Sequence, residues 1–408
     1  MNCRHCQTRL TLPLVDLGSA PLSNAYLTEA GLRAPEAWYP LRVLVCEHCW
    51  LVQTQDFACA GELFNSDYAY FSSYSRTWLA HAERYVGEMI ERFGLSPDSH
   101  VVEIAANDGY LLQYVLAHGI PCTGIEPTAS TAAVARDKGI QIIEDFFGSR
   151  LAEILAAEGR LADLIVANNV LAHVPNINDF VLGFTHLLKP QGVASFEFPH
   201  LLRLIAETQF DTIYHEHFSY LSLTAVERIF QNNGLAVFDV EEFPTHGGSL
   251  RVFAQRQDTG THRLSERVDI LLQRESEAQL DSPAGYSGFQ EKTDRVKNAF
   301  LAFLLDAENQ HRMVAAYGAA AKGNTLLNYA GVRSDLLPYV VDRNPAKQGK
   351  YLPGSRIPIV GEERLRETRP DAILVLPWNL KAEIIGQLGY ALDWKANFVT
   401  AIPKLTIS

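Results

Sequence analysis

The stretch at residues 101–112, VVEIAANDGYLL, constrains the fold of this chain more than any other. Residues 101–104 are an apolar run that predicts a buried parallel strand, and a helical pattern begins at Leu111. In the loop between them, Gly109 permits a tight turn and Ala105 lets the backbone approach a ligand. A strand that runs through such a loop into a helix predicts a ligand at the carboxyl edge of an α/β sheet. A plain strand–helix turn that binds nothing has the same pattern.

Strand and helix patterns alternate from residue 76 to residue 256, and this alternation predicts a doubly wound parallel sheet. Further strands are expected at residues 121–127, 140–147, 162–170 and 192–199. Two more strand patterns, at 235–243 and 250–256, flank the turn sequence THGGS and predict an antiparallel hairpin that closes the sheet. Such a hairpin favours a methyltransferase sheet over a dehydrogenase sheet.

Polar residues at the ends of the predicted strands indicate how such a sheet would hold S-adenosylmethionine. Glu126, after the second strand, can accept hydrogen bonds from both ribose hydroxyls. Asp145 and Phe146, after the third strand, suit the adenine, because the acid can bond the exocyclic amine while the ring packs on the base. The remaining expected cofactor residues are Glu103, Ala105, Asn107, Gly109 and Asn168. The alternative for Glu126 is a carboxylate that stabilises a helix N-terminus.

The motif at residues 212–222, TIYHEHFSYLS, gathers titratable side chains just past the fifth predicted strand, which indicates an active site. His215 and His217 are two residues apart, so they do not form the HExxH arrangement of a helical metal site. In an extended segment, residues i and i+2 share a side, and a carboxylate such as Glu216 can orient a histidine there and fix its tautomer. A polar surface loop is the alternative.

Two CxxC pairs, Cys3 with Cys6 and Cys46 with Cys49, predict a tetrahedral zinc site of four thiolates. Four thiolates leave no open coordination position, so the zinc is expected to be structural. The long stretch between the pairs must contain structure of its own, and the patterns LPLVDLG and LRVLVCEHC indicate strands. Four unrelated buried thiols are the alternative.

The segment after the cysteines, FNSDYAYFSSYSRTW, interleaves aromatic residues with hydroxyls. Tyr68 and Tyr70 are therefore candidates for one wall of a polar ligand site. A surface loop has the same composition.

The last part of the chain repeats the strand–turn–helix plan in RMVAAYGAAAKGNTLLNYAG, after a charged helical pattern at 257–300. Lys322 lies in that turn at a helix N-terminus, which is a natural anion site. Asp342 ends the next strand, where a ribose-binding acid falls in a dinucleotide fold. The motif GxGxxG is absent, which argues against intact NAD. The domain is expected to hold the nucleotide diphosphate of a substrate, or else to be purely structural.

Length and charge limit the function. The 408 residues are enough for two or three domains, and a formal net charge of -12 makes nucleic acid a poor partner. No apolar run is long enough to span a bilayer, and the start, MNCRHCQTRL, does not have the pattern of a signal peptide. We therefore expect a cytoplasmic protein whose cysteines stay reduced.

EIAANDG, YHEHFSYLS, HGGSLR and the paired CxxC knuckles together resemble the sugar C-methyltransferases of deoxysugar biosynthesis. The resemblance implies a zinc-binding domain at 1–75, an S-adenosylmethionine-binding methyltransferase domain at 76–256, and a helical linker with a Rossmann-like domain at 257–408. It also implies methylation beside the ketone of a dTDP-linked 4-keto-6-deoxysugar through an enolate, at carbon 3 rather than carbon 5. One departure is Ala105, where the family usually has glycine; we expect it to cost little room and to shift the cofactor's amino-acid end slightly.

The resemblance also assigns roles to the motif residues. His217, the last histidine of YHEH, corresponds to the base, Tyr214 to the group that supports the enolate or relays its proton, and Glu216 to the group that orients the site. His173 matches a further active-site histidine, and a helix-start or core histidine is the alternative. The expected substrate contacts are Tyr68, Tyr70, His246, Lys322 and Asn324.

Two other functions stay open on the sequence alone. One is an NAD-dependent oxidoreductase that acts on a sugar nucleotide, and the other is a non-enzymatic zinc-ribbon adaptor. The expected partners are the nucleotide-linked keto-deoxysugar, S-adenosylmethionine and zinc, with no nucleic acid and no membrane. The sequence does not fix the oligomeric state, and a monomer is consistent with it.

Overall fold

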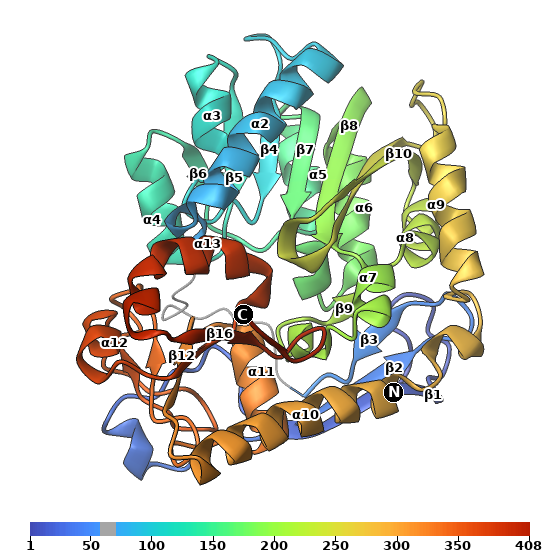
Figure 1. The fold of residues 1–408 in the computed structure, drawn as a ribbon. Helices are drawn as coiled ribbons and strands as arrows, with labels where there is room; N and C mark the ends of the chain where they lie inside the picture. The colour runs from blue at the N-terminus through green and yellow to red at the C-terminus, as the bar shows by residue number, and fades with distance from the viewer. Residues whose placement is uncertain (58–70) are drawn as a thin grey trace.

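The computed structural model describes residues 1–57 and 71–408, whose strands form three sheets (Figure 1). The N-terminal sheet is antiparallel and has the order β1-β2-β3-β9. Its strands are β1 (Leu12–Ala20), β2 (Tyr39–Val45), β3 (Val52–Thr54) and β9 (Ser219–Tyr220). The strands expected between the two cysteine pairs are therefore confirmed as β1 and β2.

The central sheet has the order β10-β11-β8-β7-β4-β5-β6. Its strands are β4 (Val101–Ile104), β5 (Cys122–Ile125), β6 (Gln141–Ile143), β7 (Ala162–Asn168), β8 (Leu188–Pro199), β10 (Leu235–Phe243) and β11 (Ser249–Arg256). Strands β4 to β8 are parallel, and β11 runs antiparallel to both of its neighbours. The predicted doubly wound sheet and its end hairpin are confirmed. The third strand stops at Ile143, before Asp145, so that acid lies in the following loop.

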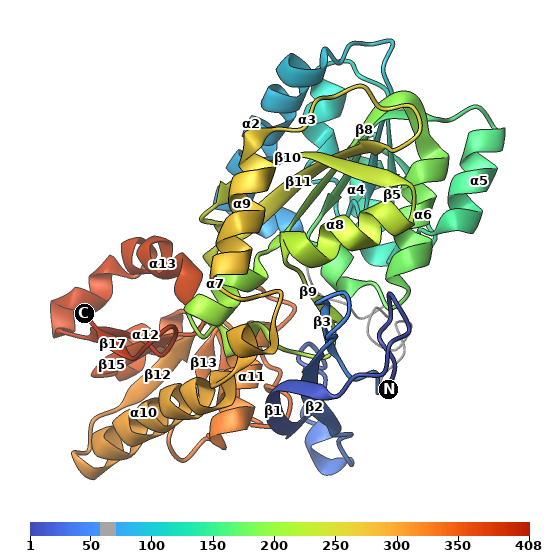
Figure 2. The ribbon, with the colours of Figure 1, turned by 90° about the vertical axis from the view of Figure 1, so that its right-hand side faces the viewer.

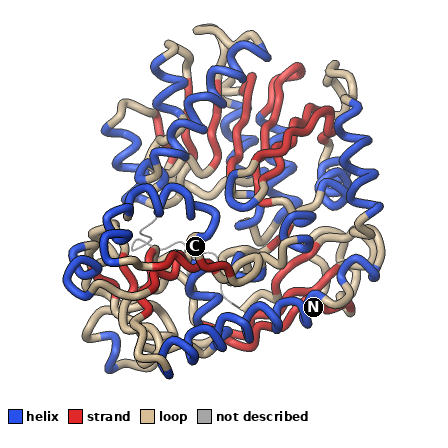
Figure 3. The backbone as a smooth tube through the Cα atoms, in the orientation of Figure 1, coloured by secondary structure: helices blue, strands red, loops and turns tan. Residues whose placement is uncertain are grey.

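Helices cover both faces of the central sheet (Figure 3). Successive strand residues point to opposite faces, so Val101 packs in the core under α2, α3 and α4, while Val102 packs in the core under α5, α6, α8 and α9. The bounds are α2 (Arg76–Phe93), α3 (Leu112–Ala117), α4 (Ala129–Asp137), α5 (Ser149–Ala157), α6 (Ile177–Leu187), α7 (Leu201–Ala206), α8 (Leu223–Asn232) and α9 (Glu266–Glu277). Helix α9, expected in a linker, belongs by its packing to the central core.

The C-terminal sheet has the order β14-β13-β12-β15-β16-β17, and all pairs but the last are parallel. Its strands are β12 (Val314–Tyr317), β13 (Val340–Val341), β14 (Ile359–Val360), β15 (Ala372–Val375), β16 (Asn397–Thr400) and β17 (Thr406–Ile407). The helices around it are α10 (Phe289–Asn309), α11 (Ala321–Ala330), α12 (Glu363–Thr368) and α13 (Lys381–Gln387). This arrangement confirms the Rossmann-like plan. Within the described ranges, the helices are all too short or too polar to cross a bilayer.

The three sheets pack against one another and share segments of the chain, rather than forming separate domains in sequence order (Figure 2). Strand β9 follows the central β8 in sequence but pairs with β3 of the N-terminal sheet. A single apolar core joins β1 and β2 to α10, α11 and the C-terminal sheet. The residues just before β9, which carry the YHEH motif, are therefore held where the three parts meet.

Candidate active site

A cavity of about 540 Å³ opens at the carboxyl edge of β4, β5 and β7, and all three parts of the chain line it. Among the predicted site residues, its wall includes Ala105, Asn107, Glu126, Asp145, Phe146, Asn168, His173, Tyr214, Glu216, His217, His246 and Lys322. The structure thus brings together residues that the sequence places far apart. Tyr68 and Tyr70 lie outside the described residues.

Glu126 is fixed by the backbone around the cofactor loop. One carboxylate oxygen accepts the N–H of Asn107 at 3.0 Å, and the other accepts the N–H of Thr128 at 2.9 Å. Each oxygen keeps lone-pair capacity for a ligand hydroxyl. The buried side-chain oxygen of Asn168 has no hydrogen-bond partner in the described part of the chain, although it lines the cavity. Such an orphaned acceptor is typical of a site that a ligand completes.

The loop after β4 is more strained than the sequence suggests. Ala105 has a φ of 57°, in the left-handed region that non-glycine residues avoid at a cost of about 1–2 kcal/mol. We expected the methyl group of Ala105 to cost little room and to shift the cofactor slightly; the structure adds a conformational cost that this expectation did not include. Gly109, with a φ of 74°, does not line the cavity. It packs against the core instead, where a Cβ would lie 2.4 Å from Ile140 Cδ1. Glu103 is fully buried below the loop and does not line the cavity either, and burial raises its pKa well above the usual range.

His217 has its tautomer set by two neighbours. Its Nδ1 lies 2.8 Å from the carbonyl oxygen of Thr212, which can only accept, so Nδ1 carries the hydrogen. Nε2 is then an acceptor and takes the hydroxyl hydrogen of Tyr214 at 2.9 Å. Burial, together with the nearby imidazole of His173, holds the pKa of His217 well below its usual range. The ring is therefore neutral at neutral pH, and its Nε2 lone pair is held by the hydroxyl of Tyr214 at the cavity wall.

Two of the YHEH residues, His215 and Glu216, do not lie as the sequence suggested. His215 turns away, with Nε2 3.3 Å from the carbonyl oxygen of Pro40, because residues 213–218 form a turn rather than an extended strand. Glu216 does not orient His217: its carboxylate accepts from Asn24 at 3.2 Å, and its second oxygen is buried without a partner among the described residues. Burial raises the pKa of Glu216.

His173 and His246 reach the cavity from separate elements. His173 donates from Nδ1 to the carbonyl oxygen of Glu216 at 2.7 Å, and its ring lies edge-on to that of His217 at 4.6 Å. Burial lowers the pKa of His173 to about 4. His246, with a φ of 55°, follows β10, and its Nε2 is buried without a partner in the described residues. Its ring packs on Trp78 at 5.0 Å.

The C-terminal part supplies the cations of the described cavity wall, Lys322 and Lys347. Lys322 lies at the start of α11, donates to Asn379 Oδ1 at 2.9 Å, and lies 4.9 Å from the ring centroid of Trp378. Burial lowers the pKa of Lys322. Asn324 is not at the cavity, because its amide donates to the carbonyl oxygen of Ser23 at 2.6 Å. Asn324, predicted as a substrate contact, is therefore not among the residues that the structure brings to the cavity.

Several wall residues were not identified from the sequence. They include Asn24, Ser72, Trp78, Tyr110, Asn169, Asp179 and Lys347. Most come from loops whose neighbours are distant in sequence, so no local pattern marks them. Asn169 is an exception, because it sits beside the predicted Asn168 at a strand end and has a φ of 53°.

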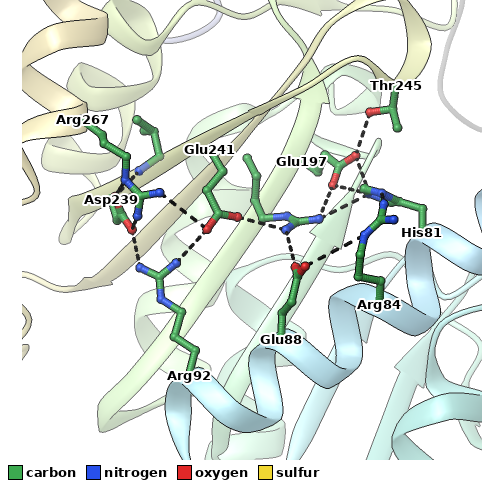
Figure 4. A network of polar contacts seen from close by, with 11 residues as sticks. His81, Arg84, Glu88, Arg92, Glu197, Asp239, Glu241, Thr245 and Arg267 are labelled. Atoms are coloured by element: carbon green, nitrogen blue, oxygen red, sulfur yellow. Dashed lines mark hydrogen bonds and ion pairs between the residues drawn. The ribbon is translucent and has the colours of Figure 1, made fainter.

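A network of polar contacts joins α2 to β8 and to the hairpin of β10 and β11 (Figure 4). Glu197 of β8 bonds His81 at 2.9 Å and Arg251 at 2.9 Å, and Thr245 donates to it at 3.3 Å. Although burial opposes it, His81 and Arg251 hold the pKa of Glu197 below the usual range. The ring of His81 stacks on that of Trp78 at 5.0 Å. The network thus fixes a cavity wall residue through paired charges, whose separation would be costly.

The four N-terminal cysteines converge as predicted. The Sγ atoms of Cys3, Cys6, Cys46 and Cys49 all lie within 4.8 Å of one another. The Sγ of Cys3 is 3.5 Å from that of Cys49, and Gln53 donates to Cys3 at 3.2 Å. The bond from Cys49 lowers the pKa of Cys3 to about 4. A thiolate cluster with a supporting donor fits a structural zinc ion.

Family comparisons agree with this arrangement. Three family models match in succession: a zinc-binding domain at residues 3–64, a methyltransferase domain at 78–240, and a C-methyltransferase C-terminal domain at 244–403. The protein is therefore a methyltransferase with a zinc-binding domain. It is 34% identical to the C-methyltransferase NovU of Streptomyces niveus over 402 residues, which is 98% of this chain and 95% of that protein. The chain belongs to this C-methyltransferase family.

Solved structures show weaker similarity. The PH0226 protein of Pyrococcus horikoshii is 14% identical, with a TM-score of 0.38, over 49% of this chain and 99% of its own. The magnesium protoporphyrin IX methyltransferase of Synechocystis, crystallised with S-adenosylmethionine, is 14% identical, with a TM-score of 0.34, over 44% of this chain and 79% of its own.

Enzymes of the C-methyltransferase family take their methyl group from S-adenosylmethionine, and the cavity fits it. Its wall offers the carboxylates of Glu126 and Asp145, the half-exposed ring of Phe146 and the orphaned oxygen of Asn168 to such a ligand. Zinc fits the four thiolates.

Proposed function

We propose that this C-methyltransferase methylates a nucleotide-linked 4-keto-6-deoxysugar beside its ketone, at carbon 3 rather than carbon 5, in branched-chain deoxysugar biosynthesis. The dTDP-linked sugar is the preferred substrate. We further propose that it works in the cytoplasm, where its thiols stay reduced. The proposed division is a zinc-binding domain at 1–75, a methyltransferase domain at 76–256, and a linker with a nucleotide-holding domain at 257–408.

The observation that carries the proposal is the neutral imidazole of His217, whose Nε2 lone pair is held at a cavity that also contains Glu126. Carbon is a poor nucleophile until a proton beside a carbonyl is removed. In the proposed reaction that proton passes to Nε2 of His217, directly or through the hydroxyl of Tyr214, and the electron pair moves onto the ketone oxygen. S-adenosylmethionine, when bound, supplies the electrophilic methyl group that the enolate carbon takes.

Other wall residues have supporting roles in the proposal. Glu216, whose pKa is raised by burial, lines the cavity and orients the sugar in this proposal. His173 packs against the base, and His246 lies on the sugar side. Lys322 and Lys347 supply the positive charge that a diphosphate needs. With Lys347 beside Lys322, two cations are available for the two phosphates, which binds a diphosphate better than one cation would.

The test combines labelled S-adenosylmethionine with a panel of 4-keto sugar nucleotides. The wild type should transfer label, and His217→Asn should reduce turnover by roughly 100- to 10,000-fold, because a general base contributes about that much. Calorimetry should show an unchanged affinity for S-adenosylmethionine. The exposed His118 at the end of α3 gives the matched control, and His118→Asn should behave as the wild type.

Solvent deuterium distinguishes the base from a binding residue. The wild type should exchange the hydrogen beside the ketone in deuterated water, and His217→Asn should not. Exchange that persists in His217→Asn would exclude this residue as the base. No transfer to any 4-keto sugar nucleotide would exclude the substrate class.

A further inference from the structure

Arg4 lies inside the first cysteine knuckle, yet its guanidinium is buried among segments that lead to the cavity. Its Nη1 donates to the carbonyl oxygen of Pro175 at 3.1 Å, and its Nη2 donates to the carbonyl oxygen of Thr54 at 3.1 Å. Asp56 accepts a further bond at 2.8 Å, and the guanidinium carbon lies 5.2 Å from the ring centroid of Phe218. The side chain is 4% exposed. Because an arginine is costly to bury, this placement calls for a function.

The bonds of Arg4 continue to the proposed base through Thr54. The hydroxyl of Thr54 donates to the carbonyl oxygen of His217 at 3.0 Å, and its backbone N–H donates to the carbonyl oxygen of Phe218 at 3.1 Å. One residue further on, Ser219 pairs with Gln53 in the N-terminal sheet. The backbone on the C-terminal side of the imidazole is therefore attached to β3 and, through β3, to Arg4.

On the other side, Arg4 is linked through Gln53 to Cys3, one of the four zinc-binding cysteines. Gln53 donates from its amide nitrogen to the sulfur of Cys3 at 3.2 Å, and its amide oxygen accepts the backbone N–H of Arg4 at 2.9 Å. Pro175, the second carbonyl that Arg4 contacts, lines the cavity two residues after His173. The knuckle is thus linked to the segments that carry His173 and His217.

We propose that Arg4 is a positioning residue for His217, through which the zinc knuckle sets the location of the base. This inference rests on the proposed role of His217 and adds a role for the zinc knuckle, whose own residues do not line the cavity. The metal-bound sulfur orients Gln53, Gln53 and the knuckle backbone orient Arg4, and Arg4 fixes the carbonyl groups of Thr54 and Pro175. A loose knuckle would let His217 drift while the cofactor site stays intact.

The test uses Arg4→Gln in the zinc-loaded protein. We expect the four cysteines of this variant to retain zinc, which mass spectrometry of the native protein would show. Its affinity for S-adenosylmethionine should be unchanged. Turnover should fall roughly 10- to 100-fold with little change in KM for the sugar nucleotide, because a small displacement of a catalytic group has effects of that size. The ring nitrogen signals of His217, assigned with His217→Asn, should move from a single tautomer toward a mixture. The exposed Arg9 gives the matched control, Arg9→Gln.

A second variant covers the case in which Arg4→Gln does not fold. Thr54→Val removes the hydroxyl bond to His217 and keeps the shape of the side chain, so it should change turnover and the ring signals in the same direction. If both variants keep wild-type ring signals and turnover per zinc-loaded molecule, Arg4 is only structural. If the wild type itself transfers no methyl group, the proposed function fails, whereas the ring signals still decide the role of Arg4.

Discussion

The central sheet and the C-terminal sheet end their second strands with the same arrangement, but only the central one faces the cavity. Glu126 follows β5 and accepts two backbone N–H groups, from the first loop and from its own turn, at 3.0 and 2.9 Å. Asp342 follows β13 and accepts the two corresponding N–H groups, both at 2.8 Å. Glu126 lines the cavity, and Asp342 does not. In both sheets this acid supports the backbone of the turn, and of the two only Glu126 is also available to a ligand in the cavity.

The turn after β12 shows why the C-terminal sheet differs. Gly318, with a φ of 90°, and Gly323 keep the spacing of the first and third glycines of a dinucleotide motif, and a Cβ at Gly323 would lie 2.8 Å from Leu376. These two glycines serve the tight turn and the close packing of helix on strand. Ala320 stands at the middle position, where glycine lets the backbone approach a pyrophosphate.

Side chains also occupy the C-terminal turn. The hydroxyl of Tyr26 and the ammonium of Lys347 both donate to the carbonyl oxygen of Ala319, at 2.6 and 2.8 Å. Lys347 lies 3.6 Å from Asp342. Burial alone would lower the pKa of Lys347, but the neighbouring phenol and carboxylate raise it overall, so the lysine stays charged. Tyr26 and Lys347 thus bond the turn of the C-terminal sheet, and Lys322 and Lys347 line the cavity of the central sheet.

Matched substitutions of the two acids test this contrast most strongly. Glu126→Gln should weaken S-adenosylmethionine binding by about 100-fold, since two hydrogen bonds to a charged group contribute about 3 kcal/mol. Asp342→Asn disturbs its turn in the same way, yet should change that affinity less than about twofold. Isothermal titration of both variants gives the comparison. Equal losses would mean that the acids act only through the backbone.

The lysines test whether the C-terminal sheet serves the cavity of the central one. Lys322→Met and Lys347→Met each keep the aliphatic stem and remove the charge, so KM for the sugar nucleotide should rise about tenfold, the value of one charge-assisted hydrogen bond. Turnover at saturation and S-adenosylmethionine affinity should stay near wild type. The exposed Lys404 gives the control, Lys404→Met. If turnover changed and KM did not, the proposed binding of the substrate's diphosphate by these lysines would be excluded.

Local patterns predicted most of the fold because each element has a strong period and a clear end. Helix α2 begins after Ser75, whose hydroxyl accepts from Trp78, and ends at Gly94 in the left-handed region, so both of its limits follow from sequence. The strand-end residues Glu126 and Asn168 were predicted at the cavity because parallel strands end at a common edge.

Side-chain direction within irregular segments was not predictable in the same way. The alternation rule for strands wrongly placed His215 beside His217, because residues 213–218 turn before β9 begins. The support of His217 by the carbonyl of Thr212, and the contact of Asn324 with Ser23, depend on long-range packing that leaves no local pattern. The role proposed for Arg4 could not be predicted for the same reason, since the side chain contacts Thr54 and Pro175, which are distant in sequence.

The smallest expected effect is on protein stability, and it comes from the different backbone conformations of the turn after β4 and the turn after β12. Ala105 in the central turn has a φ of 57°, so Ala105→Gly should stabilise the protein by about 1 kcal/mol, because glycine adopts this region without strain. Ala320 in the C-terminal turn has a φ of -98°, which alanine adopts freely, so Ala320→Gly should cost about 0.5–1 kcal/mol through the entropy of the unfolded chain. Thermal or urea unfolding of the two variants should therefore shift in opposite directions. Destabilisation by Ala105→Gly would exclude strain at Ala105, whereas stabilisation by Ala320→Gly would show that strain is not confined to the central turn.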